Sequence, residues 1–516
     1  MKSYKAFPFL ILVACVFLSS CSGLPTGTGG GGTTTATVSF TLVADTPPTN
    51  LGLVSLKVVP TAIMLTPTTG TATTLDINSG NGYSFDLVRL QSDSAFLGTA
   101  TKVATGTYTT VTVTFSGATL AFYNGTGTAL TNPVCPSGDV CIATFPGPFT
   151  ATITTSQDIT ANAGFGIDID LTNALTLSGT TLSLNFGNAD VASVFTLPRT
   201  NSNLTSGQLD LIEDYTGVVT VSATTATITP ATIANRPALT ATVNSSTVLD
   251  EDPTLSLCTS PTQGSISSCV SSNQAVSMDA ILNSDGTFTA QEIEPLLASP
   301  IVDTVEGTIV ALTSTITPTN QTQFTMVTTD IIPAATNSLI GSLTIGAPLV
   351  VNLSAGPIFY VDSKGLPVAS SFPTSYGFFT QSTNTAGLHV GQEVAVHVAA
   401  FTPANGATNP PTAAIASNVN TVTLRWSRFI ATPSGASTNS LFNVTSLPGY
   451  FGFTSSSILE TEIFTGVQGT NGTTNLDGIA NGSAPGSDPV GVRALFIEGS
   501  GNTLTPAFFA AKVRQH

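Results

Sequence analysis

Apolar and polar residues alternate over many short segments of this chain, and this period of two constrains its fold more than any other feature. In residues 37–42, Val, Phe and Leu alternate with Thr and Ser, and similar alternation recurs at 54–58, 109–115, 151–154 and 165–171. Alternation places the apolar side chains on one face of a half-buried strand. Turn residues separate these segments, and no long segment has the period of an α-helix. The sequence therefore predicts an all-β protein.

The composition of the chain argues against certain classes of binding partner. Charged residues make up 8% of the chain and hydrophobic residues 41%, so the chain can bury a core and differs from disordered proteins. The net charge of the full sequence is -16. An acidic surface repels phosphate backbones and anionic lipid headgroups. We therefore expect no nucleic-acid partner, and any attachment to a membrane must come from another source.

The first residues predict export. Lys2 and Lys5 precede an apolar run over residues 6–18, and two serines then precede Cys21. A charged start, a short apolar run and small residues are typical of a signal peptide, here residues 1–20. A helix that spans a membrane needs about 20 apolar residues, and this run is shorter. Cleavage before Cys21 is therefore the preferred interpretation.

Residues 18–21, Leu-Ser-Ser-Cys, resemble the lipobox of bacterial lipoproteins. The resemblance implies that the thiol of Cys21 receives a diacylglycerol. The expected partner of the protein is therefore a membrane, to which this N-terminal lipid anchors it. Several acyl chains anchor a protein stably. The non-acidic Ser22 implies the outer membrane of the cell envelope, facing the periplasm or the exterior. An ordinary secretory signal with a chance cysteine remains the alternative. Residues 21–36 contain four consecutive glycines and predict a flexible tether.

Four further cysteines form two local pairs, Cys135 with Cys141 and Cys258 with Cys269. Disulfides persist outside the cytoplasm, and each pair encloses turn residues, so two local disulfides are expected. A zinc site is the rival interpretation. Neither spacing matches a zinc knuckle, and no histidine lies near in the sequence.

The order of features in the first third of the chain resembles domain-of-unknown-function family 4382, over about residues 36–195. The features are the strands at 37–42 and 53–59, Phe85-Asp86-Leu87, Gly98, and Thr105-Gly106-Thr107-Tyr108 followed by a strand. The family implies a β-sandwich without an assigned activity, which we place at residues 37–198. The segment from Asn124 to Pro148, with its cysteine pair, looks like an insertion relative to that family.

Beyond residue 198 the pattern changes to repeated small units of strands and hairpins. Residues 307–310, 390–396 and 510–514 resemble parts of domain-of-unknown-function family 5666, which implies small β-barrel modules. The expected units are 203–298, 303–425 and 426–516. The predicted architecture is thus an N-terminal β-sandwich followed by small β-barrel-like units.

The segment from Asn283 to Glu292 resembles most of a calcium loop, with oxygen ligands at Asn283, Asp285 and Glu292. The first ligand position would be Ile281, which has no oxygen to offer. Asp285-Gly286 between strands is also a hairpin signal. A plain β-turn is therefore preferred, and we predict no metal site and no cofactor.

Three other groups of residues carry side chains that could bind a metal, act as acid and base, or contact a sugar. His389 and His397 flank Glu393 on one strand, but regular strand spacing holds them too far apart for one metal, so a solvated face is predicted. Asp168 and Asp170 share a face and form a possible acid and base pair, although a solvated face is again preferred. Trp426 lies between two arginines, where it could stack on a sugar, but core or inter-unit packing is preferred.

No nucleophile elbow, zinc-protease helix or other catalytic motif occurs in the sequence. We therefore expect no catalytic residues and a protein that is not an enzyme. The favoured function is a lipid-anchored exported protein with a binding or envelope-structural role. The alternative is a calcium- or carbohydrate-binding accessory protein.

Overall fold

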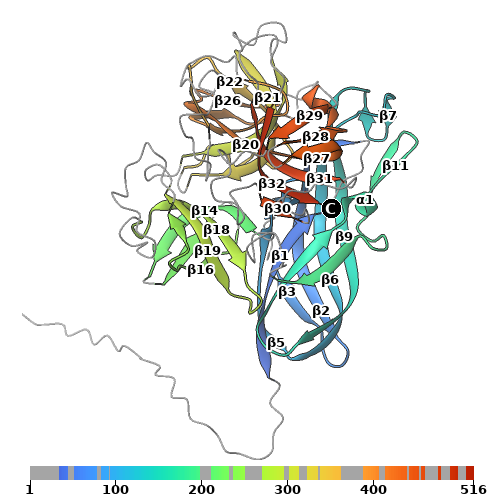
Figure 1. Ribbon diagram of the computed structural model, residues 1–516, viewed down its shortest axis with the longest axis vertical. Helices are drawn as coiled ribbons and strands as arrows, with labels where there is room; N and C mark the ends of the chain where they lie inside the picture. The colour runs from blue at the N-terminus through green and yellow to red at the C-terminus, as the bar shows by residue number, and fades with distance from the viewer. Residues whose placement is uncertain are drawn as a thin grey trace, which may run out of the picture. The chain divides into compact units, whose positions relative to one another are not determined.

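The fold is all-β, as predicted, and it is seen in a computed structural model (Figure 1). The described residues are 34–44, 51–77, 83–91, 93–197, 211–222, 224–231, 236–249, 270–295, 302–312, 322–334, 337–361, 388–405, 413–438, 441–452, 455–459, 475–477, 489–497 and 507–515. The predicted signal peptide, Cys21, Cys258 and Cys269 lie outside these residues. Within them, the α-helix is the single turn α1 (Leu171–Ala174).

Two facing sheets form the N-terminal region. The first has the order β13-β10-β1-β5, with bounds β1 (Thr35–Ala44), β5 (Ala95–Ala104), β10 (Ala163–Ile169) and β13 (Ala192–Thr196). The second has the order β3-β2-β6-β9 with β4 beside β2, and bounds β2 (Gly52–Pro67), β3 (Thr73–Asp76), β4 (Phe85–Asp86), β6 (Gly106–Tyr123) and β9 (Val140–Ile159). Two short hairpins and one 3₁₀ turn complete the region, namely β7 (Leu130–Thr131) with β8 (Val134–Cys135), β11 (Leu175–Ser178) with β12 (Thr181–Leu184), and η1 (Arg89–Gln91).

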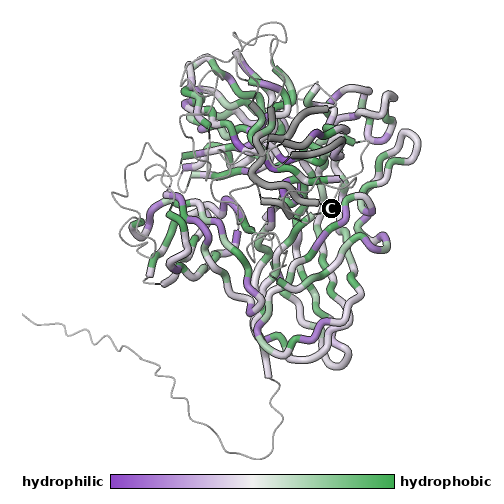
Figure 2. Tube along the Cα trace, in the orientation of Figure 1, coloured by the Kyte–Doolittle hydropathy of each residue, from purple (hydrophilic) through white to green (hydrophobic). Residues whose placement is uncertain are grey.

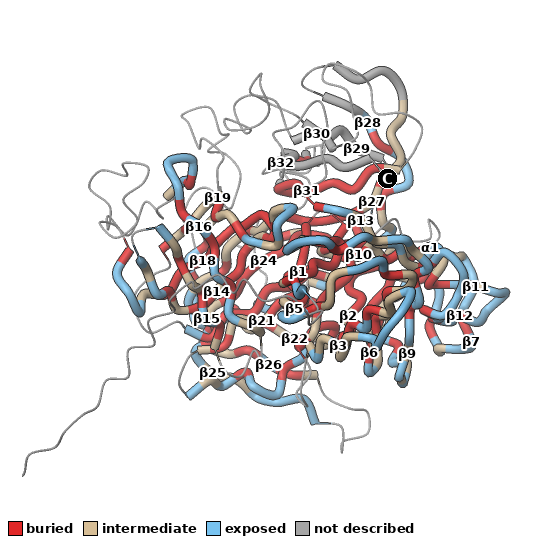
Figure 3. Tube along the Cα trace, turned by 90° about the horizontal axis from the view of Figure 1, so that it is seen from below, coloured by how far each residue is buried: buried red, intermediate tan, exposed pale blue. Residues whose placement is uncertain are grey.

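One apolar core lies between these sheets. Its fully buried members include Phe40 and Leu42 on β1, Val113 and Phe115 on β6, and Ile167 on β10. They come from the segments whose alternation predicted one apolar face, and Figure 2 shows the apolar residues along these strands. Buried residues follow β1 and β2, whereas the turn between β11 and β12 is exposed (Figure 3). Packing of two apolar sheet faces accounts for this sandwich.

We expect residues 37–198 to fold alone, because every buried member of this core except Ala36 lies within them. A domain needs its own core to fold independently. The isolated fragment should give a β-type circular dichroism spectrum and a cooperative transition in a urea titration. A fragment that lacks such a transition would show that the core depends on the rest of the chain.

The next sheet has the order β16-β15-β14-β18-β19-β17, and a further pairing of β16 with β19 closes it into a ring. This closure leaves a small barrel within the predicted unit 203–298, with the apolar side chains of Val219, Ile228, Met278 and Ile293 inside. The bounds are β14 (Leu211–Val221), β15 (Thr225–Thr229), β16 (Leu239–Thr242), β17 (Val248–Leu249), β18 (Ala275–Leu282) and β19 (Phe288–Pro295).

The remaining strands form one continuous sheet in the described part of the chain. Its path is β25-β26-β22-β21-β20-β24-β27-β28-β29-β32-β30, with β23 and β31 also beside β27. The bounds are β20 (Thr304–Leu312), β21 (Gln323–Ile332), β22 (Pro348–Asn352), β23 (Ile358–Val361), β24 (Glu393–His397), β25 (Ala400–Thr402), β26 (Ala414–Ser417), β27 (Thr421–Thr438), β28 (Leu441–Thr445), η7 (Gly449–Phe451), β29 (Ser455–Leu459), β30 (Asn475–Asp477), β31 (Val490–Ile497) and β32 (Ala507–Gln515).

The long strand β27 joins the last two predicted units. Residues 422–425 pair with β24, and residues 426–431 pair with β31. The predicted boundary between 425 and 426 thus falls inside one strand, and the two units share it. β27, β28, β29, β32 and β31 pair in a ring of their own, so the last unit is barrel-like around this shared strand.

Candidate functional site

A group of buried and half-buried ion pairs, here called the charge cluster, joins the three regions of the fold. These regions are the N-terminal sandwich, the small barrel and the C-terminal sheet. It consists of Arg89, Arg236, Arg425, Arg428 and Arg493 with Asp93, Glu213, Asp214, Glu306, Asp330 and Glu393. In the described residues, five of the chain's seven arginines therefore lie in one cluster. Long-range contacts of this kind are invisible to strand periodicity.

Arg89 enters the cluster from the N-terminal sandwich. Its guanidinium lies 2.7 Å from the Glu306 carboxylate on β20 and 3.6 Å from those of Asp214 on β14 and Asp330 on β21. Burial disfavours its charged form, but these carboxylates hold the pKa of Arg89 well above its usual value. The side chain of Arg89 thus binds the sandwich to both of the other regions.

Asp86 fixes the turn that presents Arg89. Its Oδ1 accepts hydrogen bonds from the backbone N–H of Leu56, at 2.8 Å, and of Val88, at 3.0 Å. The first bond ties the turn to β2, and the second tightens the backbone just before η1. A carboxylate that accepts several backbone N–H bonds is a local device for holding a turn.

The other arginines lie in or near the strands of the C-terminal regions. Arg428 Nε is 2.7 Å from the carboxylate of Asp93 in the sandwich, and Arg493 lies 2.7 Å from Glu213 in the barrel. Arg425 lies 3.1 Å from Glu306. Desolvation makes such buried pairs costly to form, and removal of one partner leaves a buried charge uncompensated. The cluster therefore leaves buried charges uncompensated if the regions separate or lose one of these side chains.

The predicted solvated face around Glu393 is wrong. Glu393 is 2% exposed and accepts a hydrogen bond from the Thr329 hydroxyl at 2.9 Å. Burial raises its pKa, and the nearby guanidinium groups of Arg428 and Arg89 oppose that rise. Alternation placed Glu393 on a polar face of its strand. Charged side chains from other parts of the chain, such as Arg89, cover that face, and the sequence of one strand does not show this contact.

Trp426 is 1% exposed, which confirms the packing interpretation over a sugar platform. The guanidinium of Arg493 lies 5.1 Å from the centre of its ring.

His397 ends β24, where burial lowers its pKa, while His389 precedes that strand and packs near Phe496. Among the described residues, no group of three His, Cys, Asp or Glu side chains has the geometry to hold a metal ion.

The segment with calcium-loop character forms the hairpin between β18 and β19. The Asp285 carboxylate accepts bonds from the backbone N–H and the hydroxyl of Thr287, at 3.0 and 2.6 Å. Gly286 has a φ of +77°, and its carbonyl accepts a bond from the Ser39 hydroxyl at 2.8 Å. The Asp285 carboxylate thus stabilises the turn, and the turn packs against β1.

Asp170 also stabilises a turn, since its side chain accepts a hydrogen bond from the N–H of Asn173 at the start of α1.

The loop that resembles an insertion is closed by a disulfide between Cys135 and Cys141. The side-chain amide of Asn124, which is fully buried, donates to the carbonyls of Thr128, Cys135 and Pro136 at 2.8, 3.0 and 3.1 Å. A covalent bond and three hydrogen bonds therefore fix the position of this loop.

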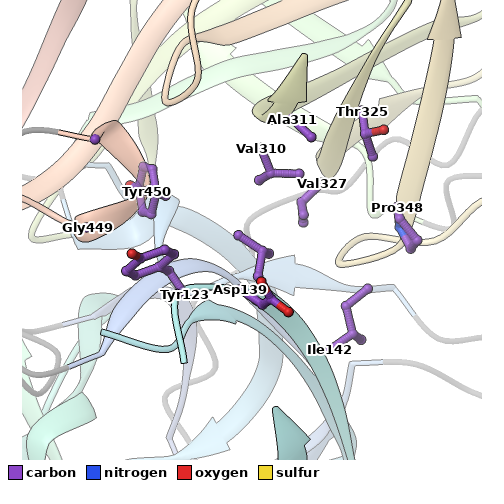
Figure 4. Close-up of a pocket in the computed structure, with 13 residues that line it drawn as sticks. Tyr123, Asp139, Ile142, Val310, Ala311, Thr325, Val327, Pro348, Gly449 and Tyr450 are labelled. Carbon is purple, nitrogen blue, oxygen red and sulfur yellow. The ribbon is translucent and has the colours of Figure 1, made fainter. Parts of the chain in front are cut away.

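The braced loop forms one wall of a cleft of about 600 Å³, shown in Figure 4. The lining residues are Tyr123, Gly138, Asp139, Val140, Ile142, Val310, Ala311, Thr325, Val327, Pro348, Gly449, Tyr450 and Gly452. They come from β6, β9 and the disulfide loop of the sandwich, from β20, β21 and β22, and from the turn η7 with the glycine that follows it. In Figure 4 the two tyrosines lie at one end, Ile142 and Pro348 lie at the other, and Asp139 lies between them.

The size and lining of this cleft suit a small ligand. Clefts of roughly 300 to 1,000 Å³ with an apolar lining and a few polar groups hold small molecules. Here the half-buried Val310 lies in the middle beside Val327, which is only 1% exposed, while Asp139 and Thr325 offer a carboxylate and a hydroxyl. No sequence pattern pointed to this site, because its residues are brought together only by the packing of separate regions.

Within the described residues, no helix is long and apolar enough to cross a membrane. Comparisons with protein-family models, with curated proteins and with solved structures find no match to this chain. The two family resemblances therefore stay predictions from the sequence.

Proposed function

We propose that this chain is an exported lipoprotein, held to a membrane by lipid on Cys21, whose β body binds a ligand in the cleft without transforming it. The observation that carries the binding role is the cleft itself. It has the volume of a small-molecule site, and the disulfide loop and Asn124 hold one wall in place. The N-terminal pattern of charge, apolar run and Ser-Ser-Cys supports the anchor and a place in the cell envelope.

The charge cluster supports a rigid body for this role. The buried carboxylates of Glu306 and Glu393 form ion pairs with Arg89 and Arg428. Their ion pairs hold the sandwich and the C-terminal sheet together, and the cleft lies between residues of these same regions. A ligand site made from two regions requires that their contact be fixed.

In native cells, we expect a photo-crosslinking amino acid at position 142 to form an adduct with an envelope component. Ile142 lines the cleft and is 40% exposed, so a ligand in the cleft lies within reach. In the Cys21→Ala form of the same protein, loss of the lipid should move the protein from the membrane fraction to the soluble fraction. Adducts are read by gel shift after irradiation and fractionation.

The matched control carries the crosslinker at Met64 on β2, which is 37% exposed and does not line the cleft. Equal adduct formation at both positions would refute a binding role for the cleft. A Cys21→Ala protein that still partitions with membranes and detergent would refute the lipid anchor. The two readouts test the two halves of the proposal separately.

A further inference from the structure

We propose that the contact between the N-terminal sandwich and the C-terminal sheet is a proton-controlled joint, tight while Asp86 and Glu393 are protonated and looser once they ionise. Asp86 lies on β4 of the sandwich, and Glu393 is the first residue of β24 in the C-terminal sheet. Such a joint is a conformational device, and its action does not depend on what the cleft binds. The balance of buried charge, the surroundings of the two carboxyl groups and the position of Tyr450 support it.

Carboxyl groups outnumber cations at this junction. The charge cluster contains five guanidinium groups and six carboxylates. Two more buried carboxyl groups lie beside it, those of Asp86 and of Asp279, whose Oδ1 accepts a hydrogen bond from the backbone N–H of Asp214 at 2.9 Å. Lys57 lies opposite Asp86 in the ladder of β2 with β4, and burial lowers its pKa. Since an unpaired charge is costly to bury, the surplus carboxyl groups favour their protonated form.

Asp86 lies on the outer face of the sandwich, the face that the C-terminal sheet covers. Its neighbour Phe85 packs in the sandwich core, so strand alternation places Asp86 on the opposite face. The hydroxyl of Ser55 lies beside Asp86, and Ser55 is the partner of Ala121 in the ladder of β2 with β6. Ala121 in turn packs in one apolar cluster with Val327 of β21. Separation of the two regions would therefore let water reach Asp86.

Contact with the C-terminal sheet disfavours the ionised form of Asp86. Burial raises the pKa of Asp86 to about 6, with a smaller contribution from repulsion by Glu393. Hydrogen bonds from Ser55 and from the backbone N–H groups of Leu56 and Val88 act in the opposite direction. These bonds come from the sandwich itself and persist when the regions separate, whereas the repulsion and part of the burial do not.

Glu393 faces the same contact from the C-terminal side and is 2% exposed. The groups around it come from several elements, namely Thr329 on β21, Arg89 on η1, Glu306 on β20, Arg425 and Arg428 on β27, Asp86 on β4 and Tyr450 on η7. The guanidinium groups of Arg89 and Arg428 lie 3.9 and 3.8 Å from its Oε1, beyond hydrogen-bond distance. Burial raises the pKa of Glu393 and repulsion from Glu306 adds to the rise, although both arginines oppose it. A proton on Glu393 therefore also stabilises the closed joint.

Tyr450 connects the joint to the cleft. Burial raises the pKa of its hydroxyl, and the charges of Glu393 and Asp86 lie near enough to add to that rise. A Cβ at Gly52 on β2 would lie 3.4 Å from Cδ1 of Tyr450, so this ring from η7 packs on the sandwich. The cleft is lined from both sides of the joint, with Tyr123 and Tyr450 at one end (Figure 4). A change in the spacing of the two regions therefore changes the width of the cleft.

Protons favour the closed joint because both carboxyl groups bind them more tightly there than in water. With a pKa of about 6 for Asp86 in the closed form and its ordinary 3.8 in the open form, the ratio of open to closed molecules should rise about tenfold between pH 5 and pH 7. The apolar contacts of the junction do not titrate and favour the closed form throughout. At still lower pH, Asp330 loses its charge and its pairs with Arg236 and Arg89, so the joint is tightest at mildly acidic pH.

Thiol labelling at position 121 measures the opening of the joint. Ala121 is fully buried in the apolar cluster of the junction, so Ala121→Cys places a thiol where a reagent reaches it when the joint opens. The variant is made in the full chain with Cys21→Ala, and each labelling rate is divided by that of a cysteine peptide at the same pH. This relative rate should rise about tenfold from pH 5 to pH 7. Asp86→Asn should remove most of the rise, and Glu393→Gln should remove part of it.

Ala151→Cys is the matched control, because Ala151 is equally buried but lies between the two sheets of the sandwich. It should label much more slowly than position 121, since its exposure requires unfolding of the sandwich. Asp190→Asn, at an exposed position, should leave the pH dependence unchanged. Circular dichroism verifies the fold of each variant. Equal labelling at positions 121 and 151 overturns the joint, because opening would then be global unfolding. A relative rate at position 121 that is constant with pH, or that rises equally in wild type and Asp86→Asn, overturns its control by protons.

Discussion

Replacement of Arg89 by methionine should lower the free energy of unfolding by about 3 to 5 kcal/mol, the range for a buried ion pair that loses one partner. The carboxylate of Glu306 is 2.7 Å from this guanidinium, and those of Asp214 and Asp330 are within 3.6 Å. Without Arg89 they remain buried with less positive charge beside them. Methionine retains most of the side-chain volume, so the effect measured by urea denaturation reports charge rather than a cavity.

The control for this prediction is Lys102→Met, which removes the same charge from an exposed position on β5. It should change stability by no more than about 0.5 kcal/mol. The double variant Arg89→Met with Glu306→Gln should recover part of the loss, because it removes one of the carboxylates left unpaired. A single variant Arg89→Met as stable as Lys102→Met would mean that the cluster contributes nothing to holding the regions together.

Asp86→Asn should stabilise the protein at neutral pH by about 2 to 3 kcal/mol. Burial raises the pKa of Asp86 from 3.8 to about 6, despite the opposing backbone bonds from Leu56 and Val88. Each unit of difference corresponds to about 1.4 kcal/mol between the two protonation states. Asparagine keeps the oxygen that accepts both bonds and removes the buried charge. The sandwich then no longer has to hold an ionised group in a site from which water is excluded.

The same pKa sets the direction of the pH dependence. Between about pH 4 and pH 6 the folded state binds more protons at Asp86 than the unfolded state. The stability of the wild type therefore falls as the pH rises through this window, and the penalty is complete above about pH 6. Asp330 acts in the opposite direction, because the guanidinium groups of Arg236 and Arg89 outweigh burial and lower its pKa, so its contribution is lost on acidification.

The Asp86 effect is isolated as the difference between variant and wild type in urea titrations at several pH values. That difference should be small near pH 4 and grow to its full size by about pH 7. Asp190→Asn, at an exposed position of the same region, is the control and should give a difference near zero at every pH. A constant difference for Asp86→Asn across the range would contradict a raised pKa at this site.

The fold class was predictable from sequence because it depends on local periodicity. The strands at 37–42, 109–115 and 165–171 were each indicated by alternation, and all three contribute buried side chains to the sandwich core. Burial of Trp426 was also predicted, since a lone large aromatic in an apolar strand usually packs inside. These are properties that one segment carries by itself.

The candidate sites could not be predicted in the same way. Arg89, Glu306 and Arg425 are each separated from the next by more than a hundred residues, and each looks like a solvated residue when only its own segment is considered. The one available signal was the scarcity of arginine, with two of the few placed in Leu424-Arg425-Trp426-Ser427-Arg428 among apolar residues. The cleft gave no signal at all, because Tyr123 and Tyr450 meet only after the regions have packed.

The position of β1 has a mechanical consequence. Tension that arrives through the N-terminal segment enters the body at Thr35, the first residue of β1. This strand is flanked on one side by β10 in parallel register and on the other by β5 in antiparallel register. A pull along β1 therefore loads both ladders in shear, with many hydrogen bonds sharing the force, whereas an edge strand pulled sideways would peel one bond at a time. The strand at which the described body begins is thus arranged to resist extraction by a pull on its N-terminal end.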